Sequence, residues 1–270
     1  MIMKNKVIII TGASSGIGKA LALELGNLEA KIVITGRRKE ALDTVEQELR
    51  QKNIEVLSIV ADSAIEEDNQ RIINETIKKF QKIDILINNA GISMRALFED
   101  TKIEVIKQIM DINFYGMVYA TKYALPYILE SKGSIVGISS INGYRGTPAR
   151  TGYTASKFAM NGFLEALRTE VMKRDVHILV ACPGFTASNI RKYALDQNGN
   201  PQGESPREEQ KMMSAETVAK KIINAIQKRK RDLILTRQGK LAVFLNKWLP
   251  KMMDKIVYNV MKKEPNSPLK

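Results

Sequence analysis

The residues best suited to chemistry in this chain are a tyrosine and a lysine four positions apart, with a serine upstream. Tyr153 and Lys157 are separated by about one helical turn, so on a helix both project from one face. A phenol ordinarily keeps its proton at neutral pH, and a neighbouring ammonium lowers the phenol pKa toward working pH. The hydroxyl of Ser140 could hold a carbonyl oxygen or an alkoxide. Tyr and Lys also occur at this spacing on ordinary helices, so the prediction depends on the rest of the chain.

The N-terminal segment has the pattern of a dinucleotide-binding loop. An apolar, β-branched run at 6–10 is typical of a buried parallel strand, and it leads into the loop 11–18 and then into an apolar helical pattern. Glycines let the backbone approach a pyrophosphate, and a helix N-terminus offers free N–H groups. A simple tight turn is the alternative, but both flanks fit a binding loop. We therefore expect cofactor contacts from Gly12, Ser14, Ser15, Gly16, Ile17 and Gly18.

The end of the second predicted strand indicates which cofactor is bound. Enzymes that use NAD usually carry an acidic residue there, which binds the ribose hydroxyls. This chain instead has Arg37 and Arg38 after Gly36, and a planar guanidinium group suits a 2′-phosphate. A solvated basic turn is the alternative. We expect NADP(H) to be preferred over NAD(H).

Alternating strand and helix patterns provide the scaffold for these residues. Strand-like runs lie near 6–10, 31–35, 55–60, 84–87, 133–138 and 176–181, and helical patterns lie near 17–26, 39–52, 66–80, 102–130 and 153–173. This alternation is typical of a parallel sheet with helices on both faces. The length of 270 residues suits one such domain. The predicted fold class is α/β, as a single doubly wound domain with a central parallel sheet.

In chain order, the motifs resemble those of the short-chain dehydrogenase/reductase (SDR) family over residues 4–190. The glycine loop is one match, and Asp62 stands where the family has the residue beside the adenine. The run 88–91, Asn-Asn-Ala-Gly, is similar to the family's motif after its fourth strand. The further matches are Asn113, Ser140, Tyr153, Lys157 and Pro183-Gly184. Several matches in the right order are far more specific than one.

This resemblance implies a Rossmann-type fold and an oxidoreductase acting on CH–OH and C=O groups. It implies that Tyr153 transfers the proton, while Lys157 favours the phenolate and binds the nicotinamide ribose. Ser140 would orient the carbonyl, and Asn113 would organise a water in the proton relay. The family usually has Thr where this chain has Ser188, which keeps a hydroxyl for the carboxamide of the cofactor. The other cofactor contacts that it implies are Asp62, Asn89, Gly91, Pro183, Gly184 and, as a second candidate beside Ser188, Thr186.

Composition narrows the remaining classes of protein. The single cysteine, Cys182, excludes an internal disulfide and favours a reducing compartment, and we expect a buried, unreactive thiol. The single histidine, His177, is expected to be a packed or edge residue, and we expect no metal site. No apolar run reaches the roughly 18 residues of a membrane span, and no secretory signal is evident. The formal net charge is +13, but no nucleic-acid module is recognisable, so we expect no nucleic-acid partner.

Two segments near the C-terminus have open assignments. Residues 188–214 are polar and rich in turn formers, which suits either a substrate lid or an ordinary flexible loop. In 240–270, apolar residues recur every three or four positions beside a row of lysines, and Pro250 should break or kink this helix. The extension could cover the domain's own core or cleft, pair with a second subunit, or lie on an anionic membrane surface. It is most similar to the extension of the SDR family's member 7 and 7B branch, whose relatives reduce lipophilic ketones at membranes.

These observations predict an NADP(H)-binding domain at 1–239, including the lid, and an amphipathic basic extension at 240–270. The predicted function is NADP(H)-dependent interconversion of a carbonyl and a secondary alcohol, with a lipophilic substrate. We expect a cytoplasmic homo-oligomer, a dimer or a tetramer, with peripheral membrane contact as one alternative for the extension. The alternative function is an NADP(H)-binding interaction or membrane-docking protein with little turnover.

Overall fold

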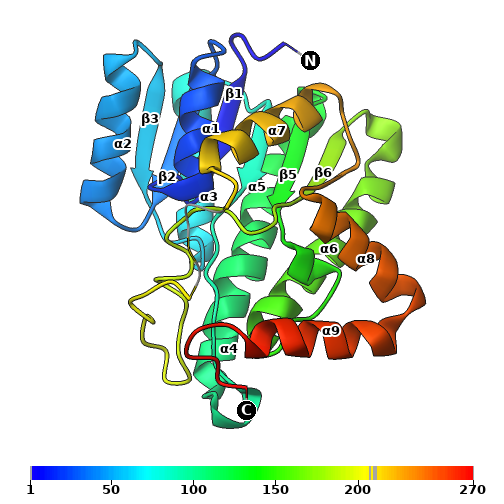
Figure 1. Cartoon of the computed structure of the whole chain (residues 1–270). Coiled ribbons are helices and arrows are strands. Elements are labelled where there is room, and N and C mark those ends of the chain that lie inside the picture. Colours follow the sequence, from blue (N-terminus) through cyan, green and yellow to red (C-terminus); the bar gives the residue numbers. More distant parts are fainter. Residues whose placement is uncertain (1, 207, 209–211, 270) are drawn as a thin grey trace.

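A parallel sheet lies at the centre of the molecule (Figure 1). The computed structural model describes residues 2–206, 208 and 212–269 of the chain. Within these residues the strand order is β3-β2-β1-β4-β5-β6-β7, and neighbouring strands are parallel. The strands are β1 (Val7–Ile10), β2 (Lys31–Gly36), β3 (Val56–Val60), β4 (Ile85–Asn88), β5 (Ser134–Ile138), β6 (His177–Cys182) and β7 (Asp232–Ile234).

Helices cover both faces of this sheet, which explains why its central strands are mostly apolar, as β1 is at all four positions. In β1, Ile8 and Ile10 pack on one face with α1 (Gly16–Gly26), α2 (Lys39–Gln51) and α7 (Ala215–Gln227). Val7 and Ile9 pack on the other face with α3 (Glu66–Phe80), α5 (Gly116–Glu130) and α6 (Thr151–Glu170). Successive side chains of a strand point to opposite faces, so two covered faces require an uninterrupted apolar run. The predicted doubly wound α/β fold is confirmed.

One predicted helix is divided in the structure. The sequence pattern indicated a single helix near 102–130, whereas the chain forms α4 (Ile103–Met110), a π-helical turn (Asp111–Tyr115) and then α5. A π-helical turn accommodates one extra residue within an otherwise helical segment, so the apolar pattern continues through it. Such turns are frequent at functional sites, and this one contains Asn113.

The strand order places a cleft at the carboxyl ends of the strands. The chain runs outward from β1 to β3 on one side and then crosses to β4 on the other side. In open α/β sheets, ligands bind outside the carboxyl ends of the strands at this switch point. The loops after β1, β2, β4, β5 and β6 therefore meet at one edge of the sheet.

The C-terminal extension forms two helices beside this cleft (Figure 1). In this view the helix α8 (Arg237–Trp248) descends along the right side of the molecule, and α9 (Pro250–Lys262) runs across its lower part. The predicted break at Pro250 is confirmed, because this residue begins α9, a position where the missing N–H group is tolerated. Among the described residues, no helix is both long and apolar enough to cross a membrane.

Candidate active site

The loops at the carboxyl ends of the strands enclose a cavity of about 1690 Å³. It brings together nearly all of the residues expected to bind cofactor or substrate. Those lining it are Gly12, Ser14, Ser15, Gly16, Ile17, Arg37, Arg38, Asp62, Asn89, Gly91, Ser140, Tyr153, Lys157, Pro183, Gly184, Thr186 and Ser188. Gly18 and Asn113 are not among the described residues that line the cavity. Both instead contact residues that do line it.

The glycine loop has the conformation and close packing that require glycine. Gly12 has φ +64°, and a Cβ atom there would lie 2.7 Å from the Cα of Ala90. A Cβ at Gly18 would lie 2.4 Å from the carbonyl oxygen of Gly12. The Asn89 amide donates to the carbonyl oxygens of Thr11 and Gly12, each at 2.9 Å. Asn89 and Gly18 therefore hold the shape of the loop.

The start of α1 fits the pyrophosphate of a dinucleotide. This helix begins at Gly16, directly after the loop, and its first turn carries no acidic residue. Among the described residues, the Ser15 side chain makes no capping hydrogen bond to the first amides of the helix. Those N–H groups and the positive end of the helix dipole face the cavity, an arrangement that favours an anionic group.

Two arginines follow β2 at one end of the cavity, where β1 and β4 separate β2 from β5. The Arg37 guanidinium lies 3.7 Å from the Asp62 carboxylate, and its side chain is 52% exposed. The Arg38 guanidinium donates to the Tyr193 hydroxyl at 3.1 Å and lies over the same ring, 5.2 Å from its centroid. Tyr193 comes from the loop after β6, so that loop reaches across the cleft to the arginines after β2.

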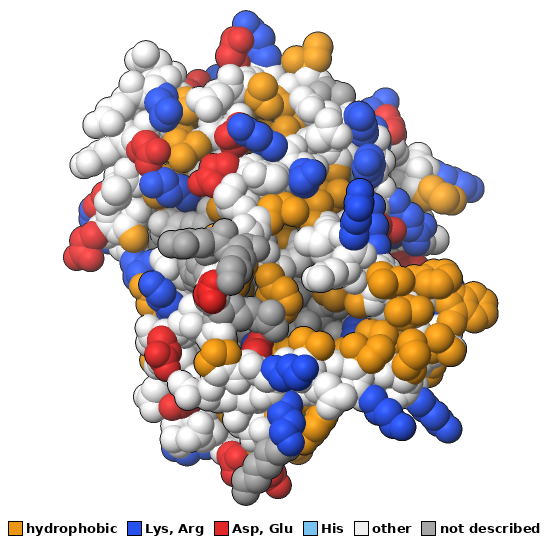
Figure 2. Space-filling view, in the orientation of Figure 1, with side chains coloured by type: hydrophobic (Ala, Val, Ile, Leu, Met, Phe, Trp, Pro, Cys, Tyr) orange, Lys and Arg blue, Asp and Glu red, His pale blue; other side chains and the backbone are white. Residues whose placement is uncertain are grey.

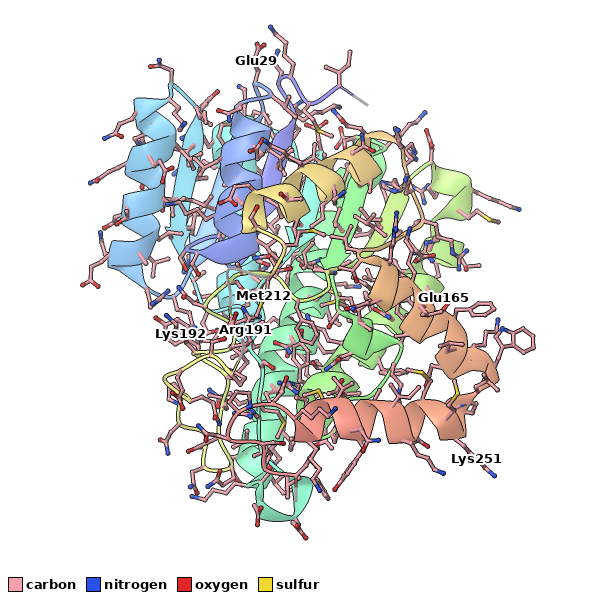
Figure 3. All side chains as sticks on the ribbon, viewed as in Figure 1. Glu29, Glu165, Arg191, Lys192, Met212 and Lys251 are labelled. Carbon is pink, nitrogen blue, oxygen red and sulfur yellow. The ribbon has the colours of Figure 1, made fainter. Side chains whose placement is uncertain are left out.

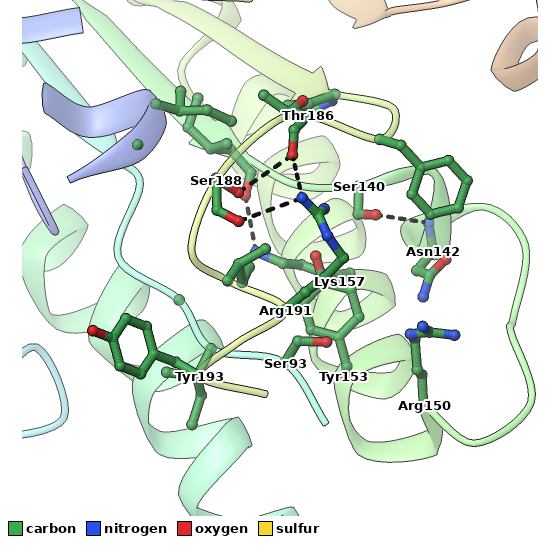
Figure 4. Close-up of a pocket in the computed structure, with 18 of the residues that line it drawn as sticks. Ser93, Ser140, Asn142, Arg150, Tyr153, Lys157, Thr186, Ser188, Arg191 and Tyr193 are labelled. Carbon is green, nitrogen blue, oxygen red and sulfur yellow. Dashed lines mark hydrogen bonds between the residues drawn. The ribbon is translucent and has the colours of Figure 1, made fainter. Parts of the chain in front are cut away.

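Ser140, Tyr153 and Lys157 meet at the other end of the cavity (Figure 4). The helix α6 carries Tyr153 and Lys157 in its first two turns, and Ser140 is the second residue after β5. The Lys157 ammonium donates to the carbonyl oxygen of Ile138 at 2.9 Å and lies 5.7 Å from the centroid of the Tyr153 ring. The Ser140 hydroxyl accepts a hydrogen bond from the backbone N–H of Asn142 at 3.1 Å. The side chains therefore share one face, as the spacing predicted.

Burial governs the protonation of this group. Burial raises the pKa of Tyr153, and hydrogen bonding with Ser140 and the positive charge of Arg150 oppose this rise only in part. Burial lowers the pKa of Lys157 to about 8. The expectation that a neighbouring ammonium lowers the pKa of Tyr153 is therefore wrong for this structure. Loss of hydration on burial raises the pKa by more than the nearby charge lowers it. The phenol is protonated at neutral pH, which is the form a proton donor must have.

Asn113 supports the site from the π-helical turn. Its side-chain oxygen accepts from the Ile92 N–H at 2.8 Å, and its amide nitrogen donates to the Ile92 carbonyl and to the Ser156 hydroxyl, each at 2.9 Å. The residue is fully buried. Asn113 thus ties the loop after β4 to α6, the helix that carries Tyr153 and Lys157.

The loop after β6 contributes a residue that the sequence did not single out. Arg191 points into the cavity, where its guanidinium donates to the carbonyl oxygens of Thr186 at 2.9 Å and Ser188 at 3.4 Å and to the Ser205 hydroxyl at 3.0 Å (Figure 4). Its neighbour Lys192 lies on the same loop (Figure 3). Many basic residues occur in this chain, so sequence alone gave no reason to choose Arg191. Residues 207 and 209–211 of the predicted lid lie outside the described residues.

The helix α9 forms an apolar wall of the cavity on the side away from the glycine loop. Met253 and Met261 of this helix are buried, at 4% and 5% exposure. The α9 residues that line the cavity are Met253, Ile256, Val257, Val260 and Met261. Of the alternatives for the extension, coverage of the cleft is therefore seen directly in the structure.

The remaining thiol and imidazole lie inside the fold. Cys182 is fully buried, and burial raises its pKa to about 12. The Nδ1 atom of His177 is hydrogen-bonded to the Ser134 hydroxyl at 3.1 Å, and its Nε2 atom is hydrogen-bonded to the Lys230 carbonyl oxygen at 2.8 Å. Burial lowers the pKa of His177. Both residues behave as the packed side chains that the sequence predicted.

Comparisons with known proteins agree with this site. A family model described as short chain dehydrogenase matches residues 6–199. The dehydrogenase/reductase SDR family member 7B of Rattus norvegicus is 34% identical over 98% of this chain and 84% of its own. An 11-beta-hydroxysteroid dehydrogenase-like 2 of Arabidopsis thaliana is 43% identical over 69% of this chain and 61% of its own. The chain therefore belongs to the short-chain dehydrogenase/reductase family, as its motifs predicted.

A solved structure supports the fold assignment independently. The short-chain dehydrogenase/reductase from Burkholderia phymatum, determined in complex with NAD, has a TM-score of 0.83 to this chain at 23% identity. The match covers 100% of this chain and 99% of that one, including the C-terminal helices. At this identity the likeness supports the fold alone, while the family match makes this protein an oxidoreductase that acts on CH–OH and C=O groups.

Proposed function

We propose that this protein is an NADP(H)-dependent oxidoreductase that interconverts a lipophilic ketone and its secondary alcohol. The observation that carries the proposal is the shared cavity of Ser140, Tyr153 and Lys157 with the glycine loop on one side and the apolar wall of α9 on the other. A carbonyl group placed between Ser140 and the expected nicotinamide position would have its apolar remainder against α9.

In this proposal the nicotinamide supplies the hydride, as it does throughout this chemistry. The Ser140 hydroxyl holds the carbonyl oxygen next to the Tyr153 hydroxyl, which donates its proton to that oxygen during reduction. Lys157 stabilises the resulting phenolate through its positive charge and would also bind the ribose. Asn113 holds the loop after β4 against α6. A chain of waters leading to Lys157 would begin at the π-helical turn that carries Asn113. In the oxidative direction the same groups act in reverse.

We infer a preference for NADP(H) over NAD(H) from the end of β2. Arg37 and Arg38 both line the cavity, and Gly36 stands where an acidic residue would bind the ribose hydroxyls. Guanidinium groups form strong charge-assisted hydrogen bonds with phosphate. The other cofactor contacts that we propose are those of the glycine loop, Asp62, Asn89, Gly91, Pro183, Gly184, Thr186 and Ser188.

We infer peripheral contact with a membrane surface from an exposed apolar patch. This patch, which we call the α8–α9 patch, consists of the side chains of Leu241, Phe244, Trp248, Leu249 and Met252. They are 56%, 61%, 67%, 48% and 41% exposed, respectively. Figure 2 shows this apolar surface with basic side chains at its edge. Lys251 points away from the body of the molecule (Figure 3), and Lys240, Lys247 and Lys255 are also exposed. An apolar patch bordered by lysines suits an anionic lipid surface.

Vesicle co-sedimentation tests this contact. The protein should sediment with anionic vesicles at low salt and be released as salt rises, because the lysine contribution is screened. Replacing Phe244 and Trp248 with Ser should abolish sedimentation. Phe98→Ser is the matched control, because Phe98 is also 62% exposed but lies outside the patch. Equal sedimentation of all three proteins, or none for the unmodified protein, would contradict the contact.

The domain division and the assembly remain proposals as well. We propose a nucleotide-binding domain at 1–239 and an extension at 240–270, in a cytoplasmic protein that forms a dimer or a tetramer. Exposed apolar side chains away from the cleft, Ile103, Tyr115 and Phe158 at 53%, 45% and 46% exposure, support assembly. Sedimentation equilibrium tests it.

Turnover tests the function as a whole. A panel of ketones that increase in apolar size, from small soluble ketones to long-chain and polycyclic ones, should be reduced with NADPH, and kcat/KM should rise with apolar size. Absence of turnover across the panel in both directions would favour the alternative, a cofactor-binding or membrane-docking protein with little catalysis.

A further inference from the structure

A buried carboxylate lies directly after α9 and meets two arginines from other parts of the fold. The Glu264 side chain is 4% exposed. Its Oε2 atom lies 3.2 Å from a terminal nitrogen of Arg150 and 3.8 Å from the Nε atom of Arg95. The two arginine side chains are themselves only 12% and 9% exposed. Three charged groups are therefore held together away from water.

The turn after α9 places Glu264 in this position. The Glu264 N–H donates to the Met261 carbonyl oxygen at 3.2 Å, and the Ser267 hydroxyl donates to the same oxygen at 2.9 Å. The Arg150 guanidinium also lies 3.8 Å from the Met261 sulfur. The Arg95 guanidinium donates to the Pro265 carbonyl oxygen. The end of α9 is thus fixed by backbone and side-chain contacts on both sides of Glu264.

The two arginines come from different segments of the chain. Arg150 lines the cavity and immediately precedes α6; its carbonyl oxygen accepts from the Thr154 N–H at 2.8 Å, in the turn that carries Tyr153. Arg95 lies on the loop after β4. Its N–H donates to the Leu195 carbonyl oxygen at 2.8 Å, and its own carbonyl oxygen accepts from the Gln202 side chain at 3.2 Å. Glu264 therefore joins the end of α9 to the start of α6 and to the loop after β4, which in turn pairs with the loop after β6.

We propose that Glu264 is a positioning residue: its carboxylate binds Arg150 and Arg95 and so holds α9 closed as the apolar wall of the substrate cleft. This inference rests on the proposed function, because it takes the cleft beside Tyr153 to be the substrate's. Among the described residues, no charged side chain within α9 itself is buried. A second ion pair of α9, between Asp254 and Arg145 at 2.7 Å, has an aspartate side chain that is 66% exposed.

The burial of this cluster explains why it can fix a geometry. Burying a carboxylate costs hydration energy, which is recovered only when partners satisfy it at close range. Displacing α9 would separate Glu264 from Arg150 and Arg95 and leave buried charges without their partners. In the Asp254–Arg145 pair the carboxylate is largely exposed to water although the arginine is not, and water weakens their attraction. The buried cluster therefore disfavours open positions of the wall much more than the exposed pair does.

The test compares Glu264→Gln with Asp254→Asn in the full-length protein. Each change removes one negative charge from the C-terminal extension at nearly constant size. Backbone hydrogen exchange over 250–262 should quicken by about tenfold or more in Glu264→Gln and stay within about twofold in Asp254→Asn. For a long apolar ketone, Glu264→Gln should raise KM by about tenfold, while kcat and the KM of a small ketone change by less than about threefold. Glu264→Asp keeps the charge and should restore most of the protection and most of the affinity.

Several outcomes overturn the inference without touching the proposed function. Unchanged exchange over α9 in Glu264→Gln, or equal losses in Glu264→Gln and Asp254→Asn, would show that the cluster does not hold the wall. A loss of kcat for small and long ketones alike would place Glu264 in the chemistry instead. Should Glu264→Gln fail to fold, the same comparison is made with Glu264→Asp, which must show a smaller but measurable change over α9. Failure of the proposed function is recognised separately, as absence of ketone turnover by the unmodified protein.

Discussion

Replacing Arg37 and Arg38 with Ala should weaken NADPH binding about a hundredfold and leave NADH binding within about threefold. A charge-assisted hydrogen bond contributes about 1.5–3 kcal/mol. The Arg37 side chain is 52% exposed and lies 3.7 Å from the Asp62 carboxylate, so solvent and this neighbour reduce its contribution to the low end. Arg38 must also leave its 3.1 Å hydrogen bond with Tyr193 to bind a phosphate. About 1.4 kcal/mol from each arginine gives about tenfold per residue and about a hundredfold for the pair.

Titration calorimetry with both cofactors measures this difference in one experiment. NADH is an internal control, because it lacks the 2′-phosphate but shares every other contact. Lys39→Ala is the matched variant, since Lys39 is the next basic residue along the chain and instead pairs with Asp43 at 2.5 Å. It should change the NADPH Kd by less than about threefold. Equal Kd values of the unmodified protein for NADPH and NADH, or equal weakening of both in the double variant, would refute the reasoning.

Two further predictions concern titration and reactivity. For reduction, kcat/KM should fall as pH rises above about 8. Lys157 has a pKa of about 8, so it carries a positive charge below this pH and loses the charge above it. A flat profile of kcat/KM up to about pH 10 would contradict the role of Lys157. Cys182 is fully buried, and burial raises its pKa to about 12. The thiol of the native protein should therefore resist alkylation at neutral pH and react only on unfolding. Rapid alkylation of the native protein, detected by mass spectrometry, would contradict its burial.

The sequence predicted the sheet well because each strand has its own local signal. The runs 7–10 and 32–34 are apolar at successive positions, as a strand covered on both faces requires, and β1 and β2 lie there. The pairing of Tyr153 with Lys157 was predictable for a similar reason. Tyr153 and Lys157 lie one turn apart on α6, so their spacing alone placed them on one face.

The parts that escaped prediction depend on contacts between distant segments. Glu264 and Arg150 are far apart in sequence, and the residues around Glu264 show only a basic tail. Arg191 is one of 42 Lys and Arg residues, and only the fold shows that it points into the cleft. The direction of the Tyr153 pKa shift also depends on burial, which a motif does not reveal.

The C-terminal extension shows both the strength and the limit of periodicity. The apolar pattern and Pro250 predicted two helical segments, and α8 and α9 confirm them. Within the single chain the stripe is covered only in part: Met253 and Met261 of α9 are buried, whereas Phe244 and Trp248 of α8 are 61% and 67% exposed. A second subunit and a membrane surface stay as the two alternatives for α8. Periodicity gives the helical face but not whether a neighbouring element lies against it.

The central claim is that Tyr153 donates the proton in ketone reduction, and single-turnover oxidation of bound NADPH by a reducible ketone tests it most directly. Tyr153→Phe should lower the rate constant by about a thousandfold while leaving the NADPH Kd within about twofold, because only the transferable proton is removed. Tyr144→Phe is the matched control, since Tyr144 is half-buried nearby but is not among the described residues that line the cavity. It should keep nearly the full rate. A rate constant for Tyr153→Phe within about tenfold of the unmodified protein across the pH range would contradict the account.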